Sequence, residues 1–194
     1  MKKILIFGIA YLIITLIVLG VILIERKTFL IEDLFSQEEV VDNKISLKAK
    51  EIHDYMRENN YGYCTYDNRC NHEGECGLNS TFEASKTGHH NTCCATYVSW
   101  VLQELGYITK QEHIDNNLNG ANNLIRFLTN KGWKEVDKKD IQPGDILCYN
   151  GHIAIYGGRG KQYDAGHIDL IRKPAPSKTA LGGNTKKILR APDL

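Results

Sequence analysis

Two neighbouring cysteines stand at the start of a predicted helix, where a thiol can become a nucleophile. Cys93 and Cys94 follow residues 91–92, an Asn-Thr pair that can cap a helix over 93–105, and Gly106 can end that helix. The free N–H groups and the dipole of a helix N-terminus favour the thiolate, which is the reactive form of cysteine. The sequence therefore predicts that one of these two thiols can attack an electrophilic carbon.

A histidine and a carboxylate that could complete such a site lie on two predicted strands, 152–156 and 162–165. A thiolate needs an imidazole that exchanges protons with it and a polar group that orients the imidazole. Strand alternation puts His152 on the same face as the small Ala154, over which we expect the helix carrying the thiol to approach. Asp164 shares that face if the connecting loop has three or five residues, whereas a loop of two or four would turn it away.

The other elements are predicted to be helices first and strands afterwards. Apolar residues recur at helical spacing over 45–56, and 122–130 is a second helical stretch. Short runs bounded by glycine and asparagine follow Trp133, at 145–149, 152–156, 162–165 and 187–190. This order is typical of an α+β fold in which helices pack on an antiparallel sheet.

Four short motifs occur in a set order along the chain. They are Cys-Ala-Thr-Tyr-Val at 94–98, Pro-Gly-Asp-Ile-Leu at 143–147, Gly-His-Ile-Ala-Ile-Tyr at 151–156 and Tyr-Asp-Ala at 163–165. In this combination the chain resembles the NlpC family of papain-like cell-wall cysteine peptidases, with the CHAP amidases as relatives. The resemblance covers about residues 45–190 and implies a papain-like fold. It implies Cys94 as the nucleophile, His152 as the base and Asp164 as the orienting acid.

The resemblance also implies what such a site would act on. The expected activity is that of a cysteine hydrolase, a peptidase or an amidase without a cofactor, on amide bonds in bacterial peptidoglycan. The family's aromatic segment before the nucleophile corresponds to Tyr61-Gly62-Tyr63, so Tyr61 and Tyr63 are expected to contact the substrate. The family usually has Asp before the nucleophile, where this chain has Cys93.

The N-terminal part of the chain is predicted to be a membrane anchor. Residues 4–24 are an unbroken apolar run, and about 20 such residues in a helix cover a bilayer core. The run continues into Glu-Arg-Lys at 25–27 instead of a small-residue cleavage site, which favours an uncleaved anchor over a signal peptide. We therefore expect an anchor over 1–27, a polar stalk over 28–44 and a hydrolase domain over 45–194. Positive charges flank the run on both sides, so we place this domain outside the cytoplasm because the expected function requires it.

Charge and cysteine content narrow the class of protein further. The formal net charge is +1, which argues against a basic surface for nucleic acid. The chain has six cysteines, more than is usual in a reducing cytosol, which favours an exported domain. A cysteine-rich insert is predicted at about 61–91. The candidates for disulfide bonds are Cys64, Cys70, Cys76 and Cys93. Zinc bound with His72, His89 or His90 is the second choice, because the cysteine spacing lacks the usual ligand pairs, and free thiols are the third.

Three other interpretations compete with this one. The same fold could be a non-catalytic, disulfide-stapled surface module in which Cys94 has no chemical role. The cysteine-rich insert could instead make the chain a metal-binding domain. Cys93 could also replace Cys94 as the nucleophile, although the order of the motifs favours Cys94. Cys148, between apolar neighbours on a strand, is expected to be a core residue.

Overall fold

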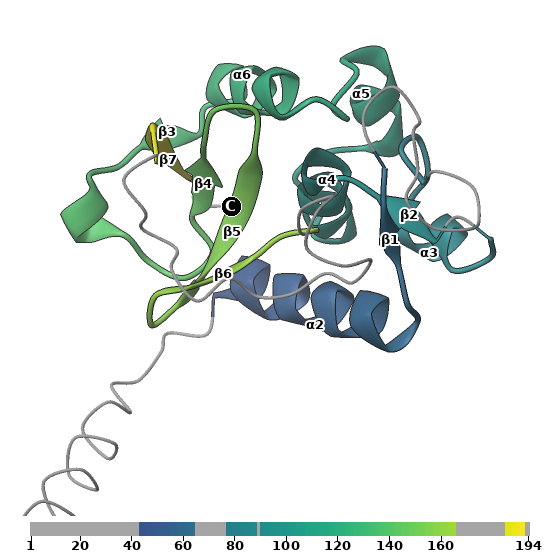
Figure 1. Ribbon diagram of the computed structural model, residues 1–194. Coiled ribbons are helices and arrows are strands. Elements are labelled where there is room, and N and C mark those ends of the chain that lie inside the picture. Colours follow the sequence, from purple (N-terminus) through teal and green to yellow (C-terminus); the bar gives the residue numbers. More distant parts are fainter. Residues whose placement is uncertain (1–42, 65–76, 89, 166–184, 193–194) are drawn as a thin grey trace, which may run out of the picture. The chain divides into compact units, whose positions relative to one another are not determined.

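The computed structural model describes residues 43–64, 77–88, 90–165 and 185–192 (Figure 1). Contacts divide the chain into two units, Met1–Val40 and Val41–Leu194, and the described residues belong to the second. The predicted anchor over 1–27 and nearly all of the predicted stalk lie outside the described residues. Among the residues that are described, no helix has the length and apolar character needed to cross a membrane.

The described residues form an α+β fold, as the order of elements predicted. The helices are α2 (Lys44–Glu58), α3 (Phe82–Ser85), α4 (Cys94–Glu104), α5 (Lys110–Asp115) and α6 (Ala121–Asn130), with one 3-10 turn, η1 (Lys138–Asp140). A five-stranded antiparallel sheet has the order β3 (Lys134–Glu135), β7 (Lys187–Arg190), β4 (Ile146–Cys148), β5 (Ile153–Gly158) and β6 (Lys161–Tyr163). A second sheet pairs β1 (Gly62–Tyr63) with β2 (Asn91–Thr92) in parallel.

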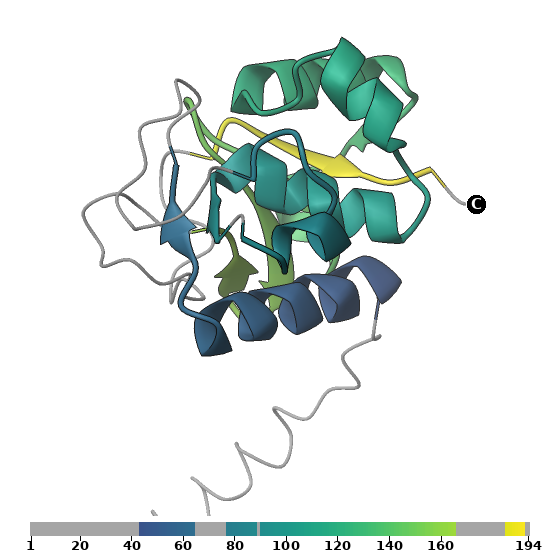
Figure 2. The same cartoon turned by 90° about the vertical axis from the view of Figure 1, so that its right-hand side faces the viewer.

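Helices α2 and α4 pack against β5 and against one another, and α6 also contacts α4. Figures 1 and 2 both show α4 between α2 and α6. Asn43 caps α2, because its side chain accepts a hydrogen bond from Ile45 N at 2.8 Å. The apolar stripe predicted over 45–56 is buried, with Ile45, Ala49, Ile52 and Met56 at most 1% exposed. Burial of this stripe fixes α2 against the sheet.

The two faces of the sheet have different partners. Ile153 and Ile155 belong to the main core that includes α2 and α4, whereas Ala154 and Tyr156 join a smaller cluster with Leu147. The expectation that α4 approaches over Ala154 is therefore wrong. The β-branched isoleucines remove more apolar area from water against the helices than an alanine would, which explains why their face is the one covered.

The hairpin of β5 and β6 has a loop of two residues and a β-bulge. Arg159 and Gly160 form the turn with φ of 50° and 68°, the left-handed values that a tight hairpin requires. A two-residue loop alone would turn Asp164 to the face opposite His152. The bulge between Tyr156 and Gly158 adds one residue to β5 and restores the shared face.

Glycine is required at the bulge itself. A Cβ on Gly157 would lie 2.5 Å from Cε2 of Tyr163, which is closer than real Cβ contacts allow. The ring of Tyr163 thus packs directly on the backbone of the bulge, one residue before Asp164. This contact couples the bulge to the position of the carboxylate.

Candidate active site

Cys94 is the first residue of α4, as the sequence predicted for the nucleophile. Its side chain is almost buried, at 4% exposure. Among the described residues no carbonyl accepts a hydrogen bond from the N–H of Cys94, since this group belongs to the first turn of the helix. The thiol and a free N–H donor therefore lie together at the positive end of the helix dipole.

Cys93 has a structural role at the same helix end. Its Sγ accepts a hydrogen bond from Thr96 N at 3.4 Å, which makes it the N-cap of α4, and donates to Asn119 O at 3.3 Å. Burial, together with the nearby charge of Cys94, raises the pKa of Cys93 to about 12. Cys93 is thus a neutral, buried thiol at neutral pH, in the place where the family usually has an Asp.

The thiol of Cys93 is free, so this residue is removed from the disulfide candidates. Cys148 is also a free buried thiol in the main core, as expected. Cys64 does take part in a disulfide. The other two candidates, Cys70 and Cys76, lie outside the described residues.

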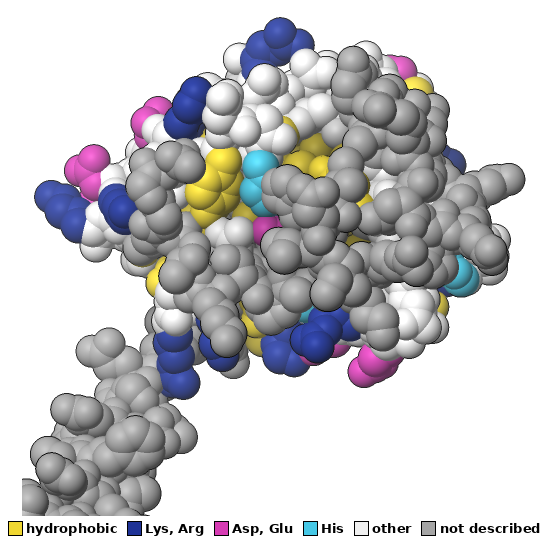
Figure 3. All heavy atoms as spheres, in the orientation of Figure 1, with side chains coloured by type: hydrophobic (Ala, Val, Ile, Leu, Met, Phe, Trp, Pro, Cys, Tyr) yellow, Lys and Arg dark blue, Asp and Glu magenta, His cyan; other side chains and the backbone are white. Residues whose placement is uncertain are grey.

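His152 and Asp164 form a hydrogen-bonded pair. Nε2 of His152 lies 3.0 Å from Oδ2 of Asp164, and the carboxylate is buried while the imidazole is partly exposed. On the face drawn in Figure 3, a histidine and an acidic side chain lie side by side between hydrophobic side chains. Because Asp164 uses Nε2, Nδ1 is the ring nitrogen that is available to Cys94.

The charge state of His152 suits an ion pair with a thiolate. Burial lowers the pKa of His152, but hydrogen bonding to Asp164, and hydrogen bonding and charge from Cys94, outweigh it and raise the pKa to about 10. The imidazole is therefore protonated at neutral pH beside the thiol. A protonated imidazole next to Cys94 is the arrangement in which a thiolate is stabilised and a leaving amine can be protonated.

Tyr63 lies beside Cys94 because β1 pairs with β2. The register sets Tyr63 opposite Thr92, two residues before Cys94. Burial raises the pKa of Tyr63, and the charge and hydrogen bonding of Cys94 raise it further. Its hydroxyl therefore stays protonated next to the thiol, where it can donate a hydrogen bond. The structure thus brings Tyr63 to the predicted site.

Tyr61 does not reach the site, and its prediction as a substrate contact is wrong. The side chain is 0% exposed, and its hydroxyl lies 2.9 Å from Ser85 Oγ. Its ring packs against Trp100 and His90. The role of Tyr61 is therefore aromatic packing in the core and not contact with a substrate.

Sequence reasoning assigned no role to two polar side chains next to the His152–Asp164 pair. Gln162 Nε2 donates to Asp164 Oδ2 at 2.8 Å, and the hydroxyl of Tyr149 donates to Gln162 Oε1 at 2.6 Å. Strand alternation signals Gln162, which lies two residues before Asp164 and so on its face. The Asn-Gly turn after Tyr149 is the signal that sets this residue opposite His152.

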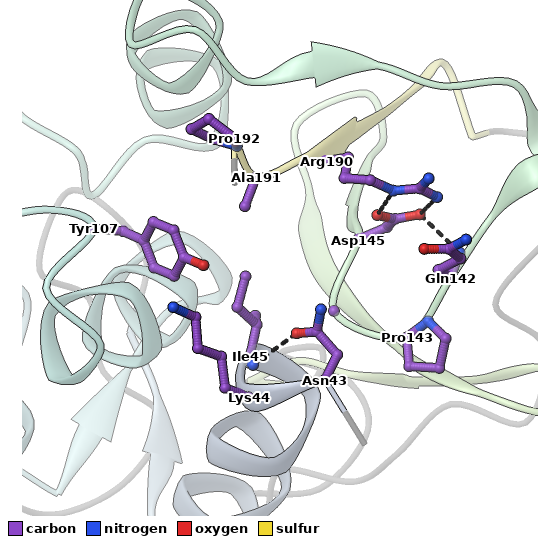
Figure 4. Close-up of a pocket in the computed structure, with 11 residues that line it drawn as sticks. Asn43, Lys44, Ile45, Tyr107, Gln142, Pro143, Asp145, Arg190, Ala191 and Pro192 are labelled. Carbon is purple, nitrogen blue, oxygen red and sulfur yellow. Dashed lines mark hydrogen bonds and ion pairs between the residues drawn. The ribbon is translucent and has the colours of Figure 1, made fainter. Parts of the chain in front are cut away.

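A separate pocket of about 300 Å³ lies at the start of α2 and beside the Pro-Gly-Asp turn (Figure 4). Arg190 lines it and holds Asp145 through two hydrogen bonds of 2.8 Å. None of the three predicted catalytic residues lines this pocket. Within the described residues there is also no group of three histidine, cysteine or acidic side chains that could hold a metal ion. His72 and His89 lie outside those residues.

A second histidine, which is buried, should make the free energy of unfolding depend on pH. His53 is fully buried on α2, its ring packs on Tyr163, and its Nδ1 lies 3.6 Å from Asp54 Oδ1, too far for a hydrogen bond. Burial lowers the pKa of His53 below 6.5, and the attraction of Asp54 and Asp164 only partly offsets this. The unfolded chain therefore binds a proton that the folded chain excludes, so the free energy of unfolding falls as the pH drops below about 6.5.

Urea denaturation between pH 7.5 and pH 5 measures this effect, and His53→Leu should remove part of the fall. His152 affects wild type and His53→Leu equally, because its raised pKa contributes stability that is fully present below pH 6.5 and is lost as pH rises from there through about 10. His90→Leu, which changes a partly exposed histidine, should keep the wild-type dependence. Equal slopes for wild type and His53→Leu would contradict the prediction.

Comparison with known proteins found no family model that matches the sequence and no characterised protein with significant similarity to it. The functional conclusion therefore depends on the geometry of Cys94, His152 and Asp164 and on the resemblance of the motifs that contain them.

Proposed function

We propose that this chain is a papain-like cysteine hydrolase that cleaves amide bonds in bacterial peptidoglycan. The observation that supports the proposal most directly is the His152–Asp164 pair, whose imidazole also has Cys94 as a partner. Three residue types needed for one reaction come from α4, from the start of β5 and from the end of β6. A thiol that serves only to pack in the core does not require a protonated imidazole beside it.

The reaction follows from the positions of these groups. The thiolate of Cys94 attacks the carbonyl carbon, and the N–H of Cys94 donates a hydrogen bond to the oxygen as it becomes negative. His152 gives its proton to the amide nitrogen, the C–N bond breaks and the amine leaves. A water molecule, whose proton His152 takes, then hydrolyses the thioester and frees the carboxylate product and the thiol.

The substrate and the location belong to the same proposal. The resemblance to cell-wall peptidases supports a peptide or amide bond of peptidoglycan as the substrate. An N-terminal anchor with the domain outside the cytoplasm would keep the enzyme close to the membrane. The disulfide at Cys64 supports an oxidising compartment, in which such bonds persist.

The test compares two substitutions of adjacent residues, Cys94→Ser and Cys93→Ser. Each removes one sulfur from the start of α4, but a hydroxyl at position 93 can still cap the helix. Wild type and both variants are incubated with purified peptidoglycan, and released fragments are identified by mass spectrometry. We expect fragments from wild type and from Cys93→Ser, and none from Cys94→Ser.

Other outcomes have distinct meanings. Loss of activity in Cys93→Ser with activity retained in Cys94→Ser would move the nucleophile to Cys93. No fragments from a folded wild-type protein would overturn the peptidoglycan substrate. In that case the disulfide at Cys64 would favour the second interpretation, a stapled surface module on the same fold.

A further inference from the structure

Gln162 is a side chain of the sheet that forms a hydrogen bond with the His152–Asp164 pair. Its Nε2 donates to Oδ2 of Asp164 at 2.8 Å, and the same oxygen lies 3.0 Å from His152 Nε2. Gln162 is 7% exposed, and Asp164 is 6% exposed. Two donors therefore converge on one carboxylate oxygen in a place with little water, where charge-assisted hydrogen bonds are strong.

Tyr149 decides which end of the Gln162 amide faces the carboxylate. The hydroxyl of Tyr149 lies 2.6 Å from Oε1 of Gln162 and donates to it. Since the oxygen end is occupied, the NH₂ end must point to Asp164, where it can only donate. The ring of Tyr149 also packs against the imidazole of His152, with 5.7 Å between the ring centroids.

The sheet register explains why these four side chains meet. Cys148 pairs with Ile153, so Tyr149 and His152 lie opposite one another just beyond the β4–β5 ladder. Tyr156 pairs with Gln162 across β5 and β6, which places the amide on the face that Asp164 shares. The four residues thus come from three neighbouring strands and their ends.

We propose that Gln162, with its amide oriented by Tyr149, is a positioning residue that holds the Asp164 carboxylate toward Nε2 of His152. The proposal rests on the proposed function and adds a fourth and a fifth side chain to its triad. Gln162 has no contact with the thiol and acts through Asp164. A carboxylate fixed in this way keeps the ring of His152 turned so that Nδ1 faces Cys94.

The test uses the alkylation rate of Cys94 by iodoacetamide, followed by mass spectrometry of the peptide that contains Cys94. Gln162→Leu removes the donor at similar size and should slow alkylation at pH 7 by about tenfold, since a hydrogen bond to a charged group is lost. At pH 10.5 most of the imidazole has lost its proton in wild type as well, because the pKa of His152 is about 10, so the variant should react as fast as wild type. A general loss of structure would change the rate at both pH values.

Two further variants separate donation from packing. Gln162→Met keeps the length of the side chain but has no donor, so it should be as slow as Gln162→Leu at pH 7. Tyr149→Phe frees the amide to turn and should slow alkylation by about threefold, because the hydrogen bond to Asp164 is then made only part of the time. Wild-type rates for Gln162→Met would overturn the proposal, because the shape of the side chain alone would then be sufficient.

The matched control is Gln111→Leu on α5. Gln111 also donates to an aspartate, Asp115, at 2.7 Å, but this exposed pair is not part of the site. We expect wild-type alkylation at both pH values. Alkylation of Cys94 needs no peptidoglycan. A failure to cleave peptidoglycan would therefore overturn the proposed substrate, whereas the alkylation rates alone test the role of Gln162.

Discussion

His152→Gln lowers kcat for amide hydrolysis by at least about 10³-fold, and this is the largest effect that we expect from any single substitution that spares Cys94. Glutamine has a similar size but can neither carry a proton to the leaving amine nor stabilise the thiolate by charge. Steady-state rates on a peptide released from peptidoglycan measure the loss. His90→Gln is the control, because His90 packs on Tyr61 and not on the triad. A loss below tenfold for His152→Gln would contradict the assigned base.

If His152 is the base, its pKa predicts how activity depends on pH. The pKa is about 10, so activity should persist into alkaline solution and fall as the imidazolium loses its proton near that pH. Asp164→Asn removes the negative charge that helps to raise this pKa, so the alkaline fall should move to lower pH. The carboxamide oxygen can still accept from Nε2, so we expect a smaller loss at pH 7 than for His152→Gln. An alkaline limb that stays in place in Asp164→Asn would contradict the role of Asp164.

Asp145→Ala should destabilise the fold by about 2–3 kcal/mol without changing the chemistry of the thiol. Asp145 is 2% exposed and accepts hydrogen bonds from Arg190 Nε, Arg190 Nη2 and Gln142 N, each at 2.8 Å. Its removal leaves the Arg190 guanidinium without its carboxylate partner and the Gln142 N–H without its acceptor. Breaking a fully buried pair costs about 3–5 kcal/mol, and the value is reduced here because Arg190 is partly exposed.

Urea denaturation gives the change in the free energy of unfolding, and the alkylation rate of Cys94 in native conditions reports on the site. Asp137→Ala is the control, since Asp137 is exposed and makes no capping hydrogen bond. A change below about 0.5 kcal/mol for Asp145→Ala would show that the pair has no structural role. The aspartate of the Pro-Gly-Asp motif would then need another explanation.

The sequence predicted the helices and strands well where hydrophobic periodicity is strong. It predicted the β5–β6 strand register poorly, because that register depends on one extra residue. The apolar stripe of α2 is a local property and has the predicted position, whereas α4 begins one residue later than predicted and has Cys93 as its cap instead of residue 91 or 92. The bulge at Gly157 is not local, because it depends on the ring of Tyr163 from the next strand. Alternation alone could not reveal that a two-residue turn and a bulge together keep Asp164 beside His152.

Burial of individual aromatic residues was equally hard to predict. Tyr61 and Tyr63 stand in the same short motif, yet Tyr61 is enclosed by Trp100 and Ser85 while Tyr63 reaches the thiol. The difference comes from the pairing of β1 with β2, two strands separated by a long stretch of chain. Propensity carries no information about such a contact, because it forms only when the core is assembled.

The bulge in the β5–β6 hairpin makes the triad sensitive to the parity of insertions. Because side chains alternate with a period of two, a single-residue insertion or deletion between Tyr156 and Gln162 that shifts the strand register would exchange Asp164 for Tyr163 or Ala165 at the histidine. A change of two residues would lengthen or shorten the hairpin and keep an acid in place. Natural or engineered changes in the length of this hairpin should therefore preserve activity when they add or remove an even number of residues, and should abolish it when the number is odd.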